Sequence, residues 1–269
     1  MGGERLNPEK IWKEYQEGKQ TYEQLSEKYN CSKKTIQRYI DRYKPLLIIQ
    51  EPREIIVLMD TTYWGQNFGV MLFKDAISKT NLLKYYVKTE TNYLYKKGIK
   101  ELESNGFKVR AIVCDGRKGL FNSFGNIPMQ MCQFHQIAII RRYLTKNPKL
   151  QAAIELKEIA SLMTKTDKES FVGALNDWFN NWETFLNERT INEETGKSFH
   201  THKRLRSAYR SLKTSLNFLF TWYDYFDLNI PNTTNAIDGH FADLKNKLRN
   251  HNGLSIERKK KFIDGFLKV

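Results

Sequence analysis

The sequence is poor in cysteine, in long apolar runs, and in acidic residues relative to basic ones. Cys31, Cys114 and Cys132 are the three cysteines among 269 residues, and they lack the even number and regular spacing of a disulfide framework. A chain of this length buries enough apolar surface to fold without disulfide bridges, and so few thiols fit a reducing compartment. No apolar run approaches the roughly 18 residues that a membrane-spanning helix needs, and the first residues lack the apolar stretch of a secretory signal. We therefore expect an intracellular protein without membrane contact.

The shortage of acids leaves a strongly positive chain. Lys and Arg number 44 against 30 Asp and Glu, so the formal net charge is +14. Such a surplus attracts polyanions and favours nucleic acid as a partner, although a basic soluble protein without this partner could have the same composition. The cations also cluster, since residues 200–217 contain no acid and carry Lys203, Arg204, Arg206, Arg210 and Lys213.

Residues 1–45 are predicted to form three short helices, because aromatic and aliphatic side chains recur there at helical spacing. Between the last two helices, Asn30 can adopt a left-handed turn conformation and Ser32 is a good helix N-cap. This pattern is typical of a helix-turn-helix domain, with a plain three-helix bundle of basic surface as the alternative. In a helix-turn-helix the last helix enters the major groove. Its candidate DNA-binding residues are Lys33, Lys34, Gln37, Arg38 and Arg42.

The pattern then changes to that of an α/β domain, whose first part we place at residues 52–146. Residues 55–59 form a β-branched and apolar run, as expected of a buried strand, and lead into Asp60. Strands are predicted at 65–73 and 82–87, followed by a helix that begins after Thr91. Residues 109–114 form a further buried strand that leads into Asp115, and a fifth strand at 127–132 precedes a helix at 135–144. Residues 147–227 have helical spacing and form an inserted subdomain, and residues 228–269 complete the core.

Two aspartates at the ends of buried strands predict a site for phosphate chemistry. A buried carboxylate is unfavourable unless it is paired or binds metal, although a single strand-end Asp can equally cap a turn. Two metal ions for displacement at phosphorus need a third acid, and Asp238 is the candidate. It lies beside a predicted buried helix stripe, on a neighbouring stripe that also carries the cations Lys245 and Arg249. The rival acids Asp243, Glu257 and Asp264 lack this context.

Four segments resemble the Mutator-like superfamily of bacterial insertion-sequence transposases. They are Asp60-Thr-Thr, Val113-Cys-Asp115-Gly, the segment at 131–136 with Cys132 and His135, and Thr233-Thr-Asn-Ala-Ile-Asp238-Gly. The resemblance spans about residues 55 to 255 and implies an RNase H-like mixed sheet with an inserted all-α subdomain. In that fold the first and fourth strands are neighbours, so Asp60 and Asp115 would lie side by side. Asp60, Asp115 and Asp238 would be the catalytic and metal-binding triad.

The sequence departs from the family at two points, and the role of the Cys-x-x-His signature stays open. The family usually has Glu where Asp238 stands, and related transposases carry a zinc ribbon that the residues before Thr21 do not supply. Cys132 and His135 provide two zinc ligands where a structural site needs four. We therefore favour a structural or DNA-contacting role for them beside the active site over zinc binding.

The resemblance implies a DDE-type transposase that cleaves transposon ends and joins them to target DNA. It implies two Mg²⁺ or Mn²⁺ ions, double-stranded DNA with terminal inverted repeats as partner, and a homodimer or larger assembly on DNA. A nucleoid-associated protein of the prokaryotic cytoplasm is expected. Two alternatives remain: an inactive or domesticated transposase that acts as a DNA-binding regulator, and an RNase H-like nuclease without strand transfer.

Overall fold

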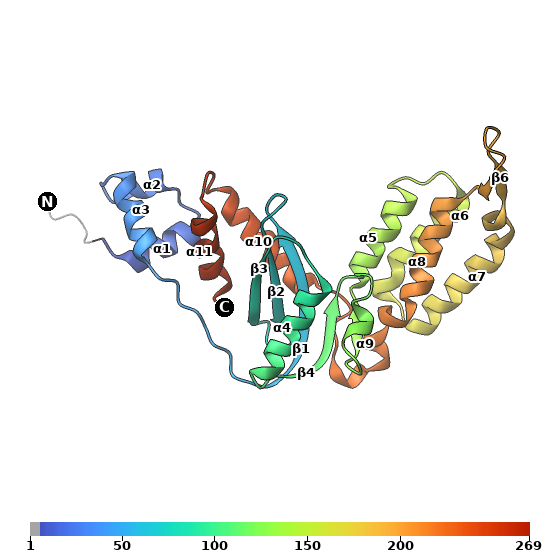
Figure 1. The fold of residues 1–269 in the computed structure, drawn as a ribbon, viewed down its shortest axis with the longest axis horizontal. Coiled ribbons are helices and arrows are strands. Elements are labelled where there is room, and N and C mark those ends of the chain that lie inside the picture. Colours follow the sequence, from blue (N-terminus) through green and yellow to red (C-terminus); the bar gives the residue numbers. More distant parts are fainter. Residues whose placement is uncertain (1–5) are drawn as a thin grey trace.

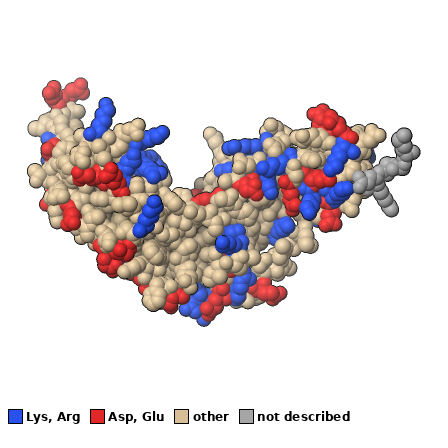
Figure 2. Space-filling view, turned by 180° about the vertical axis from the view of Figure 1, so that it is seen from behind, with Lys and Arg blue, Asp and Glu red and all other residues tan. Residues whose placement is uncertain are grey.

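The computed structural model describes residues 6–269, so the first five residues of the predicted domain 1–45 lie outside the described part. Three units follow one another along the longest axis of the molecule (Figure 1). The N-terminal helices lie beside the C-terminal helix at one end, the sheet lies in the middle, and a group of helices forms the other end. A hollow lies between the two ends of the molecule (Figure 2).

The N-terminal unit contains the three predicted helices α1 (Pro8–Gln16), α2 (Tyr22–Lys28) and α3 (Lys33–Arg42). Asn30 adopts a positive φ of 49° in the turn before α3, and the Ser32 side chain caps α3 by accepting the backbone N–H of Thr35. Both residues therefore have the predicted conformations. The apolar faces of these helices share one buried cluster with the C-terminal helix, so the unit is not packed independently.

The sheet is mixed and has the strand order β3-β2-β1-β4-β5. Strands β1 (Glu54–Tyr63), β2 (Gly69–Asp75) and β3 (Asn81–Val87) form an antiparallel meander. After α4 (Asn92–Ser104), strand β4 (Lys108–Cys114) pairs parallel to β1, and after the short 3-10 helix η1 (Phe121–Ser123), β5 (Met129–Met131) pairs parallel to β4. The predicted element order and the adjacency of the first and fourth strands are therefore present.

The inserted part contains helices α5 (Gln133–Leu144), α6 (Gln151–Leu162), α7 (Lys168–Asn187), α8 (Lys203–Leu219) and α9 (Thr221–Asp224). The 3-10 helices η2 (Met163–Lys165) and η3 (Phe226–Leu228) accompany them. Two features differ from the expected all-helical insertion at 147–227. A β-hairpin of β6 (Arg189–Ile191) and β7 (Ser198–His200) precedes α8, and α5 packs into the same apolar cluster as α6, α7 and α8.

The chain returns to the sheet with α10 (Asn235–Arg249) and ends with α11 (Ile256–Leu267). The buried stripe predicted for α10 is present, since Ile237, Phe241, Leu244 and Leu248 are all buried. Helix α11 packs against α1 so closely that a Cβ on Gly265 would lie 2.6 Å from Cζ2 of Trp12. No helix among residues 6–269 is both long enough and apolar enough to cross a membrane.

Candidate active site

Strand register brings Asp60 and Asp115 together. Asp60 lies within β1 rather than at its end, because β1 continues to Tyr63 while pairing with β2. The parallel pairing of β1 with β4 stops earlier, at Leu58 opposite Val113. Two further residues along each strand, Asp60 and Asp115 occupy matching positions on the same face of the sheet, because side chains alternate between faces. Both carboxyl groups therefore lie where β4 ends.

Asp238 reaches this edge of the sheet from the first turn of α10, which packs against β1. The hydroxyl of Thr234 donates to Oδ2 of Asp238 at 3.0 Å, and Thr234 itself is fully buried. This contact holds the carboxylate at the start of the helix, where the N-terminal dipole favours negative charge. The three predicted catalytic carboxylates thus converge from three elements that are distant in the sequence.

The electrostatics of the cluster show an excess of negative charge. Burial is the main cause that raises the pKa of Asp60 to about 8, and the negative charge of Asp115 is the second cause. Burial also raises the pKa of Asp238, while the hydrogen bond from Thr234 opposes this shift. At neutral pH the protein alone therefore favours a proton on Asp60. A divalent cation would relieve the same repulsion, because it supplies the charge that solvent cannot provide there.

His135 provides part of the positive charge. Its Nδ1 atom lies 2.8 Å from Oδ1 of Asp115, and both atoms are buried without an aligned hydrogen-bond partner, so the contact is ionic in character. Asp115 and then Cys132 raise the pKa of His135 to about 11, which makes the ring an imidazolium at neutral pH. His135 belongs to the first turn of α5 and joins the second carboxylate to the inserted helices.

Cys132 lies beside the carboxylates and forms hydrogen bonds with the surrounding backbone. It is fully buried, and its backbone N–H donates to the carbonyl oxygen of Cys114 at 2.9 Å. Its Sγ accepts the backbone N–H of Thr234 at 3.3 Å and lies 3.2 Å from the Thr234 hydroxyl. The signature therefore connects β4, α5 and α10: Cys132 positions the segment before Asp238, and His135 contacts Asp115.

The carboxylate cluster meets the requirements of a divalent metal ion only in part. The donor set of carboxylate oxygens suits Mg²⁺ or Mn²⁺, and burial together with the negative charge of Asp115 raises the pKa of Asp60. However, among residues 6–269 no group of three or more His, Cys, Asp and Glu side chains is arranged closely enough to hold a metal ion. The carboxyl groups share one neighbourhood without forming a ready coordination shell. Zinc ligation by Cys132 and His135 with Cys114, His240 or Cys31 has no support in this geometry either.

Sequence reasoning missed a second polar group on the other face of β1. The hydroxyl of Tyr95 donates to Oε1 of Glu90 at 2.8 Å and lies 3.0 Å from Oγ1 of Thr61. Arg117, which follows Asp115 by two residues, donates to the carbonyl oxygen of Glu90 at 2.9 Å and to Oδ1 of Asn92 at 2.7 Å. This network ties the residues after Asp60 and Asp115 to the start of α4. Thr61 lies on the face of β1 opposite to the face of Asp60, because side chains alternate along a strand. No local sequence pattern indicated that Thr61 would contact Tyr95.

Some of the predicted DNA-binding side chains are exposed to solvent, and others contact neighbouring groups of the protein. On α3, Lys33, Lys34, Arg38 and Arg42 are exposed and Gln37 is half-buried, although Lys33 pairs with Glu23. On α8, Lys203 lies over the Phe199 ring. Arg204 and Arg206 of the same helix donate to the carbonyl oxygens of Arg142 and Leu186 at 2.7 Å each. These two arginines therefore cap the ends of α5 and α7, whereas Arg210 is exposed and free of such a role.

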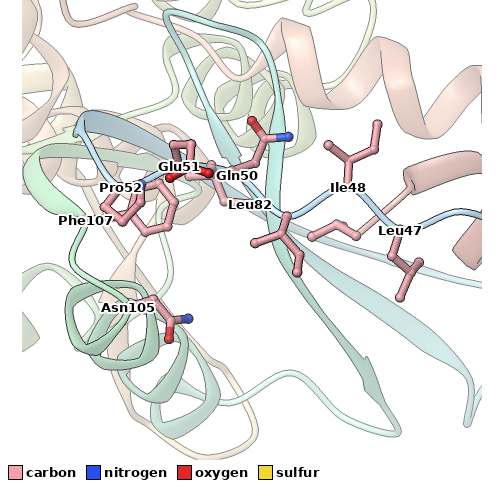
Figure 3. A pocket seen from close by; sticks show the side chains of 10 residues that line it. Leu47, Ile48, Gln50, Glu51, Pro52, Leu82, Asn105 and Phe107 are labelled. Carbon is pink, nitrogen blue, oxygen red and sulfur yellow. The ribbon is translucent and has the colours of Figure 1, made fainter.

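Lys and Arg gather on both rims of the hollow between the two ends of the molecule (Figure 2). A separate pocket of about 430 Å³ lies between residues 47–52 and the side chains of Leu82 and Phe107 (Figure 3). Its lining is mostly apolar and includes none of the predicted site residues, so the pocket is not part of the candidate active site.

Neither a protein-family model nor a curated protein matches the sequence. Among solved structures, the chain is similar to one from the simian T-cell lymphotropic virus intasome in complex with the PP2A regulatory subunit B56 gamma. The identity is 10%, the match covers 69% of this chain and 74% of that chain, and the TM-score is 0.25. A superposition of this quality assigns neither a fold family nor a function, so the functional argument rests on the site.

Proposed function

We propose that this chain is a DDE-type transposase with an RNase H-like core, as the sequence resemblance implies. The observation that carries the proposal is the convergence of Asp60, Asp115 and Asp238 at the edge where β4 ends. The strand order and the mixed pairing of the sheet support the proposed core. The net charge of +14 and the basic rims of the hollow support DNA as the substrate.

In this proposal, Asp60, Asp115 and Asp238 hold two Mg²⁺ or Mn²⁺ ions. When bound, such ions stabilise both the attacking and the leaving oxygen at phosphorus and lower the pKa of water. The protein's own contribution is to orient the carboxylates. Thr234 fixes Asp238 through its hydroxyl, and His135 fixes Asp115 through the 2.8 Å contact. Lys and Arg along the rims would hold the DNA backbone through its phosphates.

The partners and assembly follow from the same proposal. Helix α3 would recognise the terminal inverted repeats of the transposon, and the hollow would hold DNA next to the carboxylates. Two transposon ends must be held together for joining to target DNA, so we propose a homodimer or larger assembly on DNA. A nucleoid-associated location in the prokaryotic cytoplasm belongs to this proposal as well.

One observation favours a second candidate, a DNA-binding regulator without catalysis. The described residues hold no group arranged closely enough for a metal ion. A DNA-nicking assay on supercoiled plasmid with Mg²⁺ or Mn²⁺ decides between the two candidates. Cleavage by the wild type and its loss in Asp60→Asn would support an enzyme, and DNA binding without cleavage would support a regulator. Joining of transposon-end DNA to the plasmid separates a transposase from a nuclease that only cuts.

A further inference from the structure

A pocket of about 390 Å³ lies at the far end of α10, between that helix and the β1–β2 hairpin. Trp64 and Tyr63 of the hairpin line one side, and Lys245, Arg249 and Lys259 are among the residues that line the rest. Among residues 6–269, no acidic residue lines the pocket. Its volume falls in the range of roughly 300–1,000 Å³ that small-ligand sites occupy.

The pocket combines aromatic rings with uncompensated cations. Nζ of Lys245 lies 5.9 Å from the centre of the Trp64 ring, and Nζ of Lys259 lies 5.7 Å from the centre of the adjacent Phe68 ring. Trp64 is partly exposed. None of Lys245, Arg249 and Lys259 forms an ion pair with a described residue. A ligand that has both a flat ring and a phosphate meets these conditions, since bases stack on aromatic rings and Lys or Arg bind phosphate.

Two elements connect this pocket to the carboxylates. Trp64 follows Asp60 by four residues and stands one residue beyond the end of β1, which corresponds to roughly 13 Å of extended chain. It packs against the apolar cluster of α10, so it lies on the same side of the sheet as that helix. Lys245 and Arg249 follow Asp238 along α10, at about 10 and 16 Å of helix rise. Because α10 packs against β1, both paths lead from the carboxylates to the pocket over similar distances. That distance equals on the order of four base steps of DNA.

We propose that this pocket binds one unstacked nucleotide of the DNA strand whose phosphate lies at Asp60, Asp115 and Asp238. The base stacks on Trp64, and Lys245, Arg249 and Lys259 contact its phosphates. The inference rests on the proposed function, because it assumes DNA at the carboxylates. It adds that the protein recognises a nucleotide outside the duplex stack a few positions from the reacting phosphate.

The test compares two fluorescently labelled DNA probes bound to the full chain in the presence of EDTA. One is a blunt duplex, and the other is the same duplex with a short single-stranded tail that carries 2-aminopurine. We expect the wild type to prefer the tailed probe and to quench 2-aminopurine on binding. Trp64→Ala should lower the affinity for the tailed probe by about tenfold and leave that for the blunt probe unchanged, whereas Trp64→Phe should keep most of the preference.

Phe226→Ala is the matched control, because Phe226 is an aromatic residue with 81% exposure away from the pocket. If Trp64→Ala does not fold, Lys245→Gln is the second test of the pocket, and it should weaken binding of the tailed probe. The pocket assignment is overturned if the wild type binds both probes equally, if Trp64→Ala lowers both affinities alike, or if Phe226→Ala reduces the preference for the tailed probe as much as Trp64→Ala does.

Mg²⁺-dependent cleavage by the same preparation separates this result from the proposed function. Cleavage without tail preference overturns only the pocket assignment. Tail preference without cleavage supports the pocket and removes the enzyme proposal.

Discussion

The backbone N–H of Thr234 donates to Sγ of Cys132 across 102 positions of sequence. The same threonine donates its hydroxyl to Asp238, and Cys132 is followed by His135, which contacts Asp115. The Cys-x-x-His signature and the segment before Asp238 therefore form one structural unit around two carboxylates. This relationship gives Cys132 and His135 a structural role beside the carboxylates.

Replacement of Asp60 or Asp115 by Asn keeps the side-chain volume and removes the charge that a divalent cation needs. We expect Mg²⁺-dependent DNA cleavage to fall by on the order of a thousandfold or more, because metal stabilisation of the transition state contributes several kcal/mol. DNA binding measured by fluorescence anisotropy should persist. Near-normal cleavage by both variants would remove the catalytic assignment.

Asp238 stands where the resembled family usually has Glu, which makes two replacements informative. Asp238→Asn should abolish cleavage. Asp238→Glu should lower it by on the order of a hundredfold, because Thr234 holds the carboxylate of the shorter side chain and a shift near 1 Å is that costly. Asp243→Asn is the control on the same helix, since Asp243 pairs with Lys247 instead. Greater activity of Asp238→Glu would indicate a decayed site.

Cys132→Ala should destabilise the fold through Thr234. The buried backbone N–H of Thr234 would lose its acceptor, which costs about 1–3 kcal/mol, and urea denaturation would measure the loss. Cys132→Ser supplies an oxygen acceptor and should recover part of the stability. Metal analysis of the wild type should find little stoichiometric zinc. One tightly held zinc per chain that both variants lose would make Cys132 a metal ligand instead.

Docking of the N-terminal helices should weaken in acid because of His251. His251 follows α10 and is buried against helix α1, where its Nε2 lies 3.1 Å from the carbonyl oxygen of Tyr15. Burial lowers the pKa of His251. The folded state thus favours neutral His251. Its stabilising contribution is complete above the unfolded pKa of about 6.5 and is lost as the pH falls through the lower folded pKa.

The matched variant His251→Gln keeps a donor for Tyr15 and does not titrate. Thermal melting from pH 7.5 to 5, at values spaced around ~6.5, should show a smaller acid-induced decrease for this variant than for the wild type. Identical pH profiles would show that other groups control the acid sensitivity.

The exposed cations of α3 should determine preference for transposon ends. The double variant Arg38→Gln and Arg42→Gln tests this better than deletion of residues 1–45, because deletion would expose the buried face of α11. We expect a loss of about 1–3 kcal/mol for end DNA if base edges are contacted, with a smaller loss for unrelated DNA. The slope of log affinity against log salt should become less steep, by about 0.9 per lost phosphate contact. An equal loss for all sequences would limit α3 to contacts with the DNA backbone.

Much of the local structure could be predicted because it depends on neighbouring residues. Helical spacing, the Ser32 cap and the left-handed Asn30 specify the N-terminal helices, and alternation places Asp60 and Thr61 on opposite faces of β1. The buried stripe of α10 follows from the same periodicity. The ends of the two buried strands and the helix stripe beside Asp238, together with the resemblance, indicated the three carboxylates as candidates for one site.

Only the tertiary structure decided which distant groups meet. Strand pairing, not composition, continues β1 beyond Asp60, and the packing of α8 turns Arg204 and Arg206 into helix caps. The contacts of Cys132 with Thr234 and of Tyr95 with Glu90 and Thr61 depend on how separate elements pack. Sequence periodicity records the direction of a side chain relative to its own helix or strand. It does not predict which residue of another element that side chain will contact, because these contacts depend on how the whole chain buries its apolar surface.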